Sequence, residues 1–306
     1  MKNFIEIISK PDNVAIVIMM ITVLFFTCLA FFYAISGDRR RSKEGAEEPS
    51  SDLKHDSEDK TSTWDYLPTW PYLVRKEFIV AILVVVFLMV WSIIFDAPLE
   101  EIANPTRTPN PAKAPWYFLG LQEMLVYFDP WIAGVVMPTF IVLGLCLIPY
   151  IDFNPKGNGY YTWRERKFAI SIYSFGFLIL WITLIVIGVF MRGPGWVWFW
   201  PWQEWDPHVV TAEINIDLSQ IFGVDSRSLL GFIIGGLVTI GYFAVGTALP
   251  YKYLQKRGSN ALAKLGHVKY LIVVTFLLMM LGLPIKIFLR LLFHIKYIWA
   301  TPWFNI

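Results

Sequence analysis

Three aromatic residues and a carboxylate lie within eight residues of one another. Trp116, Tyr117 and Phe118 are consecutive, and Glu123 follows Trp116 by seven positions. If this segment is helical, Trp116, Leu119 and Glu123 share one face, because residues three to four apart are neighbours on a helix. Flat rings with a phenol hydroxyl suit the binding of a flat, hydroxyl-bearing ligand, and a carboxylate beside them suits proton acceptance. Glu123 would then project beside the aromatic rings, where a carboxylate can accept a proton.

Two other interpretations of these residues remain open. Trp and Tyr at a membrane edge commonly serve as interface anchors. Glu123 could instead cap a helix or pair with Lys113 or Arg107. The same loop holds further acidic residues that are alternative proton carriers, namely Asp96, Glu100, Glu101 and Asp129.

The segment before the aromatic residues is rich in proline. Pro105, Pro109, Pro111 and Pro115 fall between two strongly apolar runs. Irregular backbone at membrane depth must be buried in protein or line a cavity. A rigid segment here therefore favours a binding pocket, which Pro115 would help to shape together with Trp116 and its neighbours.

The composition indicates a membrane protein that is polytopic and all-α. Of 306 residues 56% are hydrophobic and only 16% are charged, whereas soluble domains usually carry more charge. Six apolar runs are long enough to cross a bilayer, which takes about 20 residues: Val14–Ile35, Phe78–Phe95, Trp131–Tyr150, Phe168–Met191, Leu229–Leu249 and Val268–Leu292, the last kinked or ended near Pro284.

Other classes fit poorly. The net charge of +2 does not suggest a nucleic-acid partner. The two cysteines, Cys28 and Cys146, both lie in apolar runs and do not form a disulfide framework, and the sequence has no Cys-x-x-Cys-His motif for a covalent haem.

The predicted organisation has five parts. Residues 1–41 form a transmembrane anchor, read as retained rather than cleaved because its basic cluster follows the apolar run. Residues 42–65 are polar and mixed in charge, which predicts a flexible linker. Residues 66–191 form a three-helix core, 192–228 a Trp-rich outer loop, and 229–306 two further helices and an outer tail.

Loop charges predict the orientation. With the N-terminus outside, the inner pieces 36–77, 151–167 and 250–269 hold 17 Lys and Arg, and the outer pieces hold 9. The positive-inside rule then places the linker in the cytoplasm and the proline-rich loop outside. A bacterial-type inner membrane is the expected location.

Residues from about Trp70 to Phe190 resemble the C-terminal part of cytochrome b, which is a separate chain, subunit IV, in cytochrome b6f complexes. The resemblance rests on Ala103-Asn104-Pro105, on Thr108-Pro109, on Lys113-Ala114-Pro115-Trp116-Tyr117-Phe118-Leu119, and on two helices after the loop with a short basic connection. It implies a haem-free transmembrane subunit of a cytochrome bc/b6f-type complex. Pro115, Trp116, Tyr117, Phe118 and Leu119 would form part of the outer quinol-oxidation site.

The sequence departs from the family pattern at one informative position. Pro115 stands where the family usually has the Glu that is thought to accept a proton from quinol, so that role does not carry over and Glu123 is the first replacement to test. The first helix, the linker and the last two helices also lie outside the subunit IV core.

The resemblance also implies partners and cofactors. A two-haem subunit like the N-terminal half of cytochrome b, a Rieske iron–sulfur protein, a c-type cytochrome and membrane lipids are expected. Haem b and the iron–sulfur cluster would belong to partners, because this chain lacks facing pairs of His in its predicted helices. Its four histidines are His55, His208, His267 and His294.

Further predictions concern a helix entrance, the Trp-rich loop and the alternative functions. Arg75 and Lys76, at a helix entrance, could line an inner quinone site, although basic residues often extend to the interface from helix ends. The Trp residues at 196–205 are expected to form an interfacial belt or to pack on a partner.

The alternative function is a structural scaffold without a working quinol site. A transporter is disfavoured, because the helices show no charge pair inside the membrane.

Overall fold

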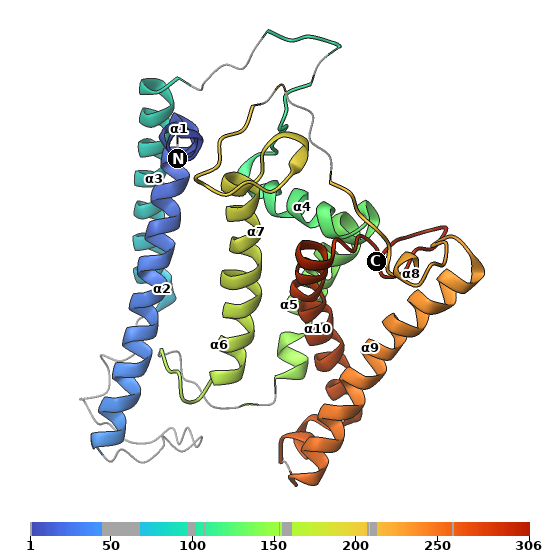
Figure 1. Cartoon of the computed structure of the whole chain (residues 1–306). Helices are drawn as coiled ribbons and strands as arrows, with labels where there is room; N and C mark the ends of the chain where they lie inside the picture. Colours follow the sequence, from blue (N-terminus) through green and yellow to red (C-terminus); the bar gives the residue numbers. More distant parts are fainter. Residues whose placement is uncertain are drawn as a thin grey trace. The chain divides into compact units, whose positions relative to one another are not determined.

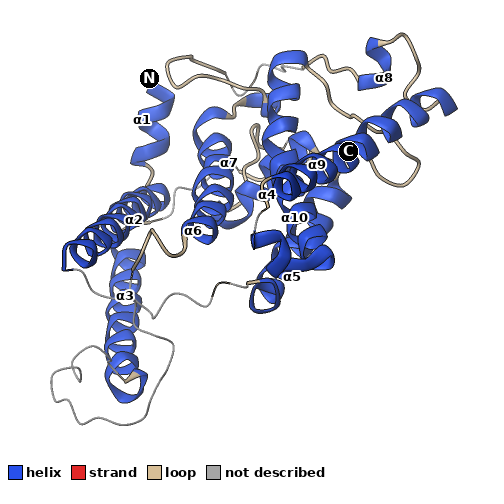
Figure 2. Cartoon of the chain, turned by 90° about the horizontal axis from the view of Figure 1, so that it is seen from below, coloured by secondary structure: helices blue, strands red, loops and turns tan. Residues whose placement is uncertain are grey.

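The computed structural model describes residues 2–44, 68–96, 102–106, 108–152, 154, 161–206, 208, 213–258 and 260–306. Its described residues form helices and connecting segments, with isolated bridges and no extended strand (Figure 2). They fall into two compact units. One comprises residues 1–4, 105–158 and 165–306, and the other 5–104 and 159–164. The linker predicted over 42–65 lies outside the described residues from 45 on, and 42–44 belong to a helix.

The helices match the predicted all-α membrane fold. In chain order they are α1 (Lys2–Ser9), α2 (Pro11–Glu44), α3 (Val74–Ile94), α4 (Trp116–Tyr127), α5 (Met137–Ile151), α6 (Lys167–Tyr173), α7 (Ile182–Val186), α8 (Leu218–Ile221), α9 (Leu229–Lys256) and α10 (Asn260–Phe293). Wider π-helical turns extend several of them, at Thr69–Leu73, Ile132–Val136, Ser174–Trp181 and Ile187–Met191.

Six of these stretches are long and apolar enough to cross a bilayer, which confirms the six predicted segments. They are Asn13–Arg40, Thr69–Ile94, Ile132–Ile151, Lys167–Met191, Leu229–Lys256 and Leu262–Phe293. The chain is thus a multi-pass membrane protein.

The last helix excludes one of the two alternatives at Pro284. It continues through Pro284 to Phe293, so it does not end there, and the residue with non-helical backbone angles inside it is Gly266. Arg290 therefore lies inside the last span, where it is only 9% exposed and pairs with Glu213 at 3.2 Å. This pair was not predicted, because Glu213 and Arg290 lie 77 positions apart in the chain.

Within the smaller unit, Asp38 of α2 fastens the segment 161–164. Its carboxylate accepts hydrogen bonds from the Thr162 hydroxyl at 2.7 Å and from the backbone N–H groups of Trp163 and Arg164 at 2.9 and 2.8 Å. Charge-assisted bonds of this kind are stronger than neutral ones. They fix the short basic segment against the end of α2.

Within the larger unit, α4 runs across the ends of the long helices (Figure 1). It contacts α7 and α10, and α10 also contacts α5 and α9. Pro115 directly precedes α4, with ψ near 150°, and a proline here costs no helical hydrogen bond because the first N–H groups of a helix have no partner. The α4 helix is short and carries the predicted site.

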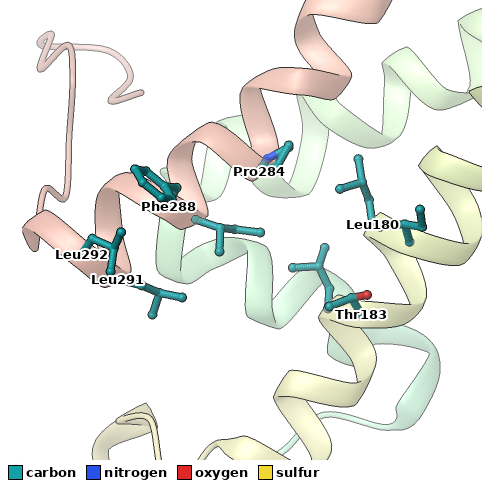
Figure 3. Close-up of a pocket in the computed structure, with 9 residues that line it drawn as sticks. Leu180, Thr183, Pro284, Phe288, Leu291 and Leu292 are labelled. Atoms are coloured by element: carbon teal, nitrogen blue, oxygen red, sulfur yellow. The ribbon is translucent and has the colours of Figure 1, made fainter.

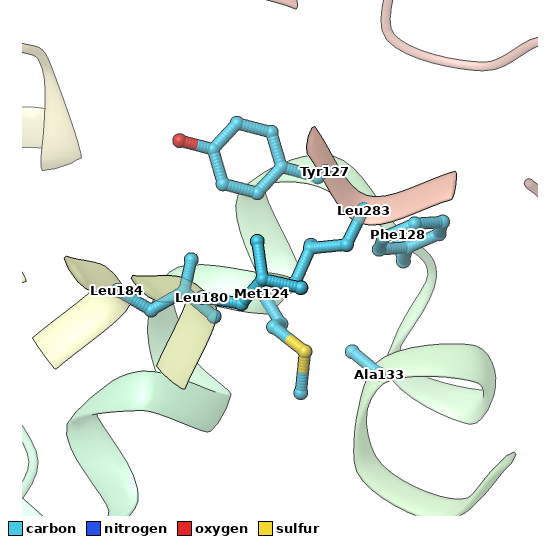
Figure 4. Close-up of a cluster of buried hydrophobic side chains, with 7 residues drawn as sticks. All are labelled: Met124, Tyr127, Phe128, Ala133, Leu180, Leu184 and Leu283. Carbon is cyan, nitrogen blue, oxygen red and sulfur yellow. The ribbon is translucent and has the colours of Figure 1, made fainter. Parts of the chain in front are cut away.

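The core lies directly beneath α4. Figure 4 shows Met124, Tyr127 and Phe128 of the α4 region meeting side chains from the neighbouring helices. The partners are Ala133, Leu180, Leu184 and Leu283. Between membrane helices such contacts act through van der Waals packing, since lipid is as apolar as the side chains, and this cluster packs α4 against the helices below it.

Candidate functional site on helix α4

The two sides of α4 have opposite environments. Leu119 and Glu123 are 2% and 0% exposed, whereas Tyr117 and Phe118 are 78% and 53% exposed. Trp116 is half-buried and meets Phe190 edge-on at a ring distance of 6.2 Å. The shared face of Trp116, Leu119 and Glu123 was predicted, but that face packs inward, and the structure does not bring Glu123 together with Tyr117 and Phe118.

A glycine lets α4 approach the helix that ends at Met191. A Cβ atom on Gly188 would lie 2.9 Å from Leu119 Cγ, and one on Gly120 would lie 3.3 Å from the Trp181 ring. The first distance is a clash. Leu119 therefore belongs to a close helix–helix contact, which explains its burial.

The buried face of α4 holds an ion pair. Glu123 and Arg192 meet at 2.6 Å between Oε1 and Nη2, and their side chains are 0% and 1% exposed. Arg192 Nε also donates to both carboxylate oxygens, at 3.2 and 3.0 Å. This two-point geometry is the strong form of a carboxylate–guanidinium contact.

Two aromatic side chains complete the Glu123–Arg192 network. The Tyr127 hydroxyl donates to Glu123 Oε1 at 2.8 Å, and Trp196 Nε1 donates to Oε2 at 3.0 Å. Arg192 Nη1 donates to the Trp196 carbonyl at 3.0 Å, and its guanidinium lies 5.5 Å from the centre of the Trp198 ring. A carboxylate offers about four lone-pair positions, so the acceptor capacity of Glu123 is filled.

Burial and the contacts within the network shift the pKa values of Tyr127 and Arg192. Burial raises the pKa of Tyr127, and the charge of Glu123 raises it further, so the phenol stays neutral. Burial alone would lower the pKa of Arg192, but hydrogen bonds and charge from Glu123 raise it above its ordinary value. Arg192 is therefore a permanent cation whose partner is Glu123.

Three members of this network, Tyr127, Arg192 and Trp196, were not predicted as partners of Glu123. A cation partner for Glu123 was one of the open alternatives, with Lys113 or Arg107 as that partner, and Trp196 was expected in an interfacial belt or in packing on a partner. Arg192 and Trp196 follow Glu123 by 69 and 73 positions. The available signal was Arg192 itself, a lone cation directly after an apolar run.

Polar side chains hold the proline-rich loop in place. Gln122 of α4 accepts from the backbone N–H of Ala114 at 2.7 Å and donates to the carbonyl of Ala112 at 2.8 Å. The Lys113 ammonium donates to the carbonyl of Val189. Asn110 accepts from the Gly195 N–H at 2.8 Å. The loop is thus anchored to α4, to the end of the 167–191 helix and to the Trp-rich segment.

The alternative acidic residues occupy different settings. Glu100, Glu101 and Arg107 lie outside the described residues, and Asp96 is exposed. Asp129 accepts from the Trp131 N–H at 2.9 Å and from the Asn305 amide at 3.1 Å. Asp129 therefore ties the end of α4 to the C-terminal tail.

The remaining candidates lie elsewhere. Arg75 and Lys76 are exposed in the first turn of α3, in the smaller unit. His267 lies in α10 and His294 just beyond it, while His55 is outside the described residues. Among the described residues no group of His, Cys, Asp and Glu could hold a metal ion.

An apolar cavity of about 420 Å³ lies beside the core under α4. Figure 3 shows Leu180 and Thr183 on one wall and Pro284, Phe288, Leu291 and Leu292 on the other. Thr183 supplies the only side-chain hydroxyl in this lining. The cavity suits a hydrocarbon chain rather than a ring with polar substituents.

Comparison with known proteins relates one part of the chain to a family. Residues 102–200 match the family model described as cytochrome b (C-terminal)/b6/petD. A protein from Geobacillus thermodenitrificans named menaquinol:cytochrome c reductase cytochrome c subunit is 34% identical over 86 residues, which cover 26% of this chain and 34% of that protein. The chain thus matches about a third of the length of this relative, and no solved structure matches. Residues 102–200, with α4 and the Glu123–Arg192 pair, form a domain of the cytochrome b C-terminal family.

Proposed function

We propose that this chain is a haem-free transmembrane subunit of a cytochrome bc/b6f-type quinol:cytochrome c reductase, and that α4 forms part of its outer quinol-oxidation site. The observation that carries the proposal is the exposed aromatic side of α4. Tyr117 and Phe118 are largely exposed within a domain of the cytochrome b C-terminal family. A pair of exposed rings with one hydroxyl, on an anchored helix, supplies the apolar wall and the hydrogen-bonding group that a ring-shaped ligand needs.

In this proposal the pocket is completed by a partner. Pro115, Tyr117 and Phe118 provide one wall for the quinol ring, and Trp116 and Leu119 hold that wall on the helix below. A two-haem cytochrome b subunit provides the opposite wall, a Rieske protein takes the first electron, and a c-type cytochrome receives it. The relative's printed name, which includes menaquinol and cytochrome c, supports this class of reaction.

Glu123 has two proposed roles that depend on the state of its network. With all its donors in place, it positions the segment 192–198 against α4. Before Glu123 can accept a proton from quinol, one of the side chains that donates a hydrogen bond to it must move away. Trp196 is the partner that can leave, because it is half-buried whereas Tyr127 and Arg192 are 0% and 2% exposed. A proton would then reach Glu123 from the Trp196 side.

The alternative function is a scaffold without a working quinol site. It is favoured by Pro115 in place of the family's usual Glu and by the filled acceptor capacity of Glu123. A binding role for Arg75 and Lys76 at an inner quinone site is a separate proposal. Both are exposed basic side chains at the start of a membrane span.

Quinol turnover separates these functions. In the assembled complex, Tyr117→Ala combined with Trp116→Ala is expected to reduce quinol:cytochrome c turnover at least tenfold without loss of assembly. Tyr150→Ala is the matched control, because Tyr150 is 71% exposed at the far end of α5. Unchanged turnover in the double variant would support the scaffold. Purification without a b-haem or Rieske partner would overturn the assignment to this complex.

A further inference from the structure

A second cavity, of about 890 Å³, lies between α9 and α10, outside the cytochrome b-like domain. These two helices lie closest where α9 ends and α10 begins, and they separate toward their other ends (Figure 1). The groove between them is lined by apolar and aromatic side chains, with Lys252 and His267 at one end and Thr239 and Trp299 at the other.

The length of the groove corresponds to one leaflet of a bilayer. Thirteen residues of α9 separate Thr239 from Lys252, which at the helical rise is about 20 Å. Half of a bilayer with its headgroup region is also about 20 Å thick. A chain seated along Ile240, Ala244 and Ala248 would thus run from the membrane surface to the midplane.

The end near Lys252 is suited to an anion. His267 Nδ1 lies 3.2 Å from the Tyr251 hydroxyl, which leaves Nε2 as the second hydrogen-bonding position of the ring. The segment 250–269, which runs from the end of α9 into the start of α10, holds five Lys and Arg, and the sequence has no acidic residue after Asp225. Juxtamembrane basic clusters attract anionic lipid headgroups, by about 1 kcal/mol per cation.

We propose that this groove binds an anionic phospholipid of the adjacent leaflet. Its phosphate would contact Lys252 and His267, and one acyl chain would occupy the groove toward Thr239. Charge complementarity and the match in length favour this occupant. The competing ligand is a quinone, because Thr239 Oγ1 and Trp299 Nε1 are buried at the far end without a hydrogen-bond partner in the described part of the chain.

The test uses the intact complex in nanodiscs made of phosphatidylglycerol or of phosphatidylcholine, followed by detergent extraction and native mass spectrometry. Wild type is expected to retain one phosphatidylglycerol and to lose phosphatidylcholine. Lys252→Gln should weaken retention about fivefold. Ala248→Trp, which fills the groove without changing charge, should abolish it. The matched controls are Lys256→Gln and Leu249→Trp, exposed residues of the same helix that do not line the groove. Leu249→Trp should behave as wild type, and Lys256→Gln, which removes one charge of the basic cluster but no contact in the groove, should weaken retention less than Lys252→Gln.

Three results would overturn the proposal. Equal retention of the two lipids would remove the role of headgroup charge. Release of the lipid by inorganic phosphate at physiological concentration would indicate a site for free phosphate. Stoichiometric quinone, lost in Ala248→Trp, would identify the other ligand. Lipid retention is measured without turnover, so its failure is distinct from failure of the proposed quinol function.

Discussion

Substituting Glu123 by Gln should destabilise the protein strongly and locally. Both members of the pair are within 1% of complete side-chain burial, so the change leaves the Arg192 charge in a buried site without its counter-charge. Removal of one partner from a buried ion pair costs about 3–5 kcal/mol. Gln retains one carbonyl oxygen, which can still accept from Tyr127 or Trp196, so we expect the lower end, about 3 kcal/mol.

A double-mutant cycle isolates the pair. Arg192→Met alone should cost a similar amount, because Glu123 then becomes the unpaired buried charge. The combination of Glu123→Gln with Arg192→Met removes both charges and should recover about 2 kcal/mol relative to the sum of the single changes. The free energy of unfolding in mixed detergent micelles, followed by tryptophan fluorescence, measures all three variants.

Limited trypsin digestion locates the effect. Arg192 is 2% exposed, so the bond after it should resist cleavage in wild type. In Glu123→Gln the segment 192–198 loses its main attachment, and cleavage after Arg192 should accelerate. The reasoning would be refuted if the single changes added without recovery in the double variant, or if trypsin cut both proteins at the same rate.

Three further predictions concern the surroundings of the site. Gly188→Ala should cost about 1–3 kcal/mol of stability in a thermal melt, because its Cβ would lie 2.9 Å from Leu119 Cγ. Gly134→Ala is the control, because its Cβ would meet nothing within 4 Å, and equal melting points for the two variants would contradict the packing argument. Burial raises the pKa of Tyr127, so wild type should lose stability as pH rises past about 10, where the unfolded tyrosine ionises but the folded one does not. Tyr127→Phe should lose less stability over the same pH range, and parallel curves of stability against pH for the two proteins would contradict this account. Gln122→Ala removes two hydrogen bonds to the proline-rich loop, so amide exchange at Ala114 should speed up, and unchanged exchange would show that other contacts hold the loop.

Much of the fold was predictable from local pattern. Runs of apolar residues longer than about 20 specify membrane helices, because a helix satisfies its own backbone hydrogen bonds in lipid. The helical face joining Trp116, Leu119 and Glu123 follows from the helical period in the same way. The choice between a helix that ends at Pro284 and one that continues was left open by the sequence, because neighbouring helices decide whether a proline inside a membrane helix ends it.

The sequence by itself determined that the chain is an all-helical membrane protein with a cytochrome b-like segment around Pro115–Leu119. Only the tertiary structure decided which side of α4 faces inward, and that Glu123 lies there with Arg192 and Trp196 instead of beside Tyr117. The helical period specifies which residues share a face but not what that face meets. The partners of Glu123, Arg192 and Trp196, lie about 70 residues further along the chain. Only the packing of the helices brings that segment against α4.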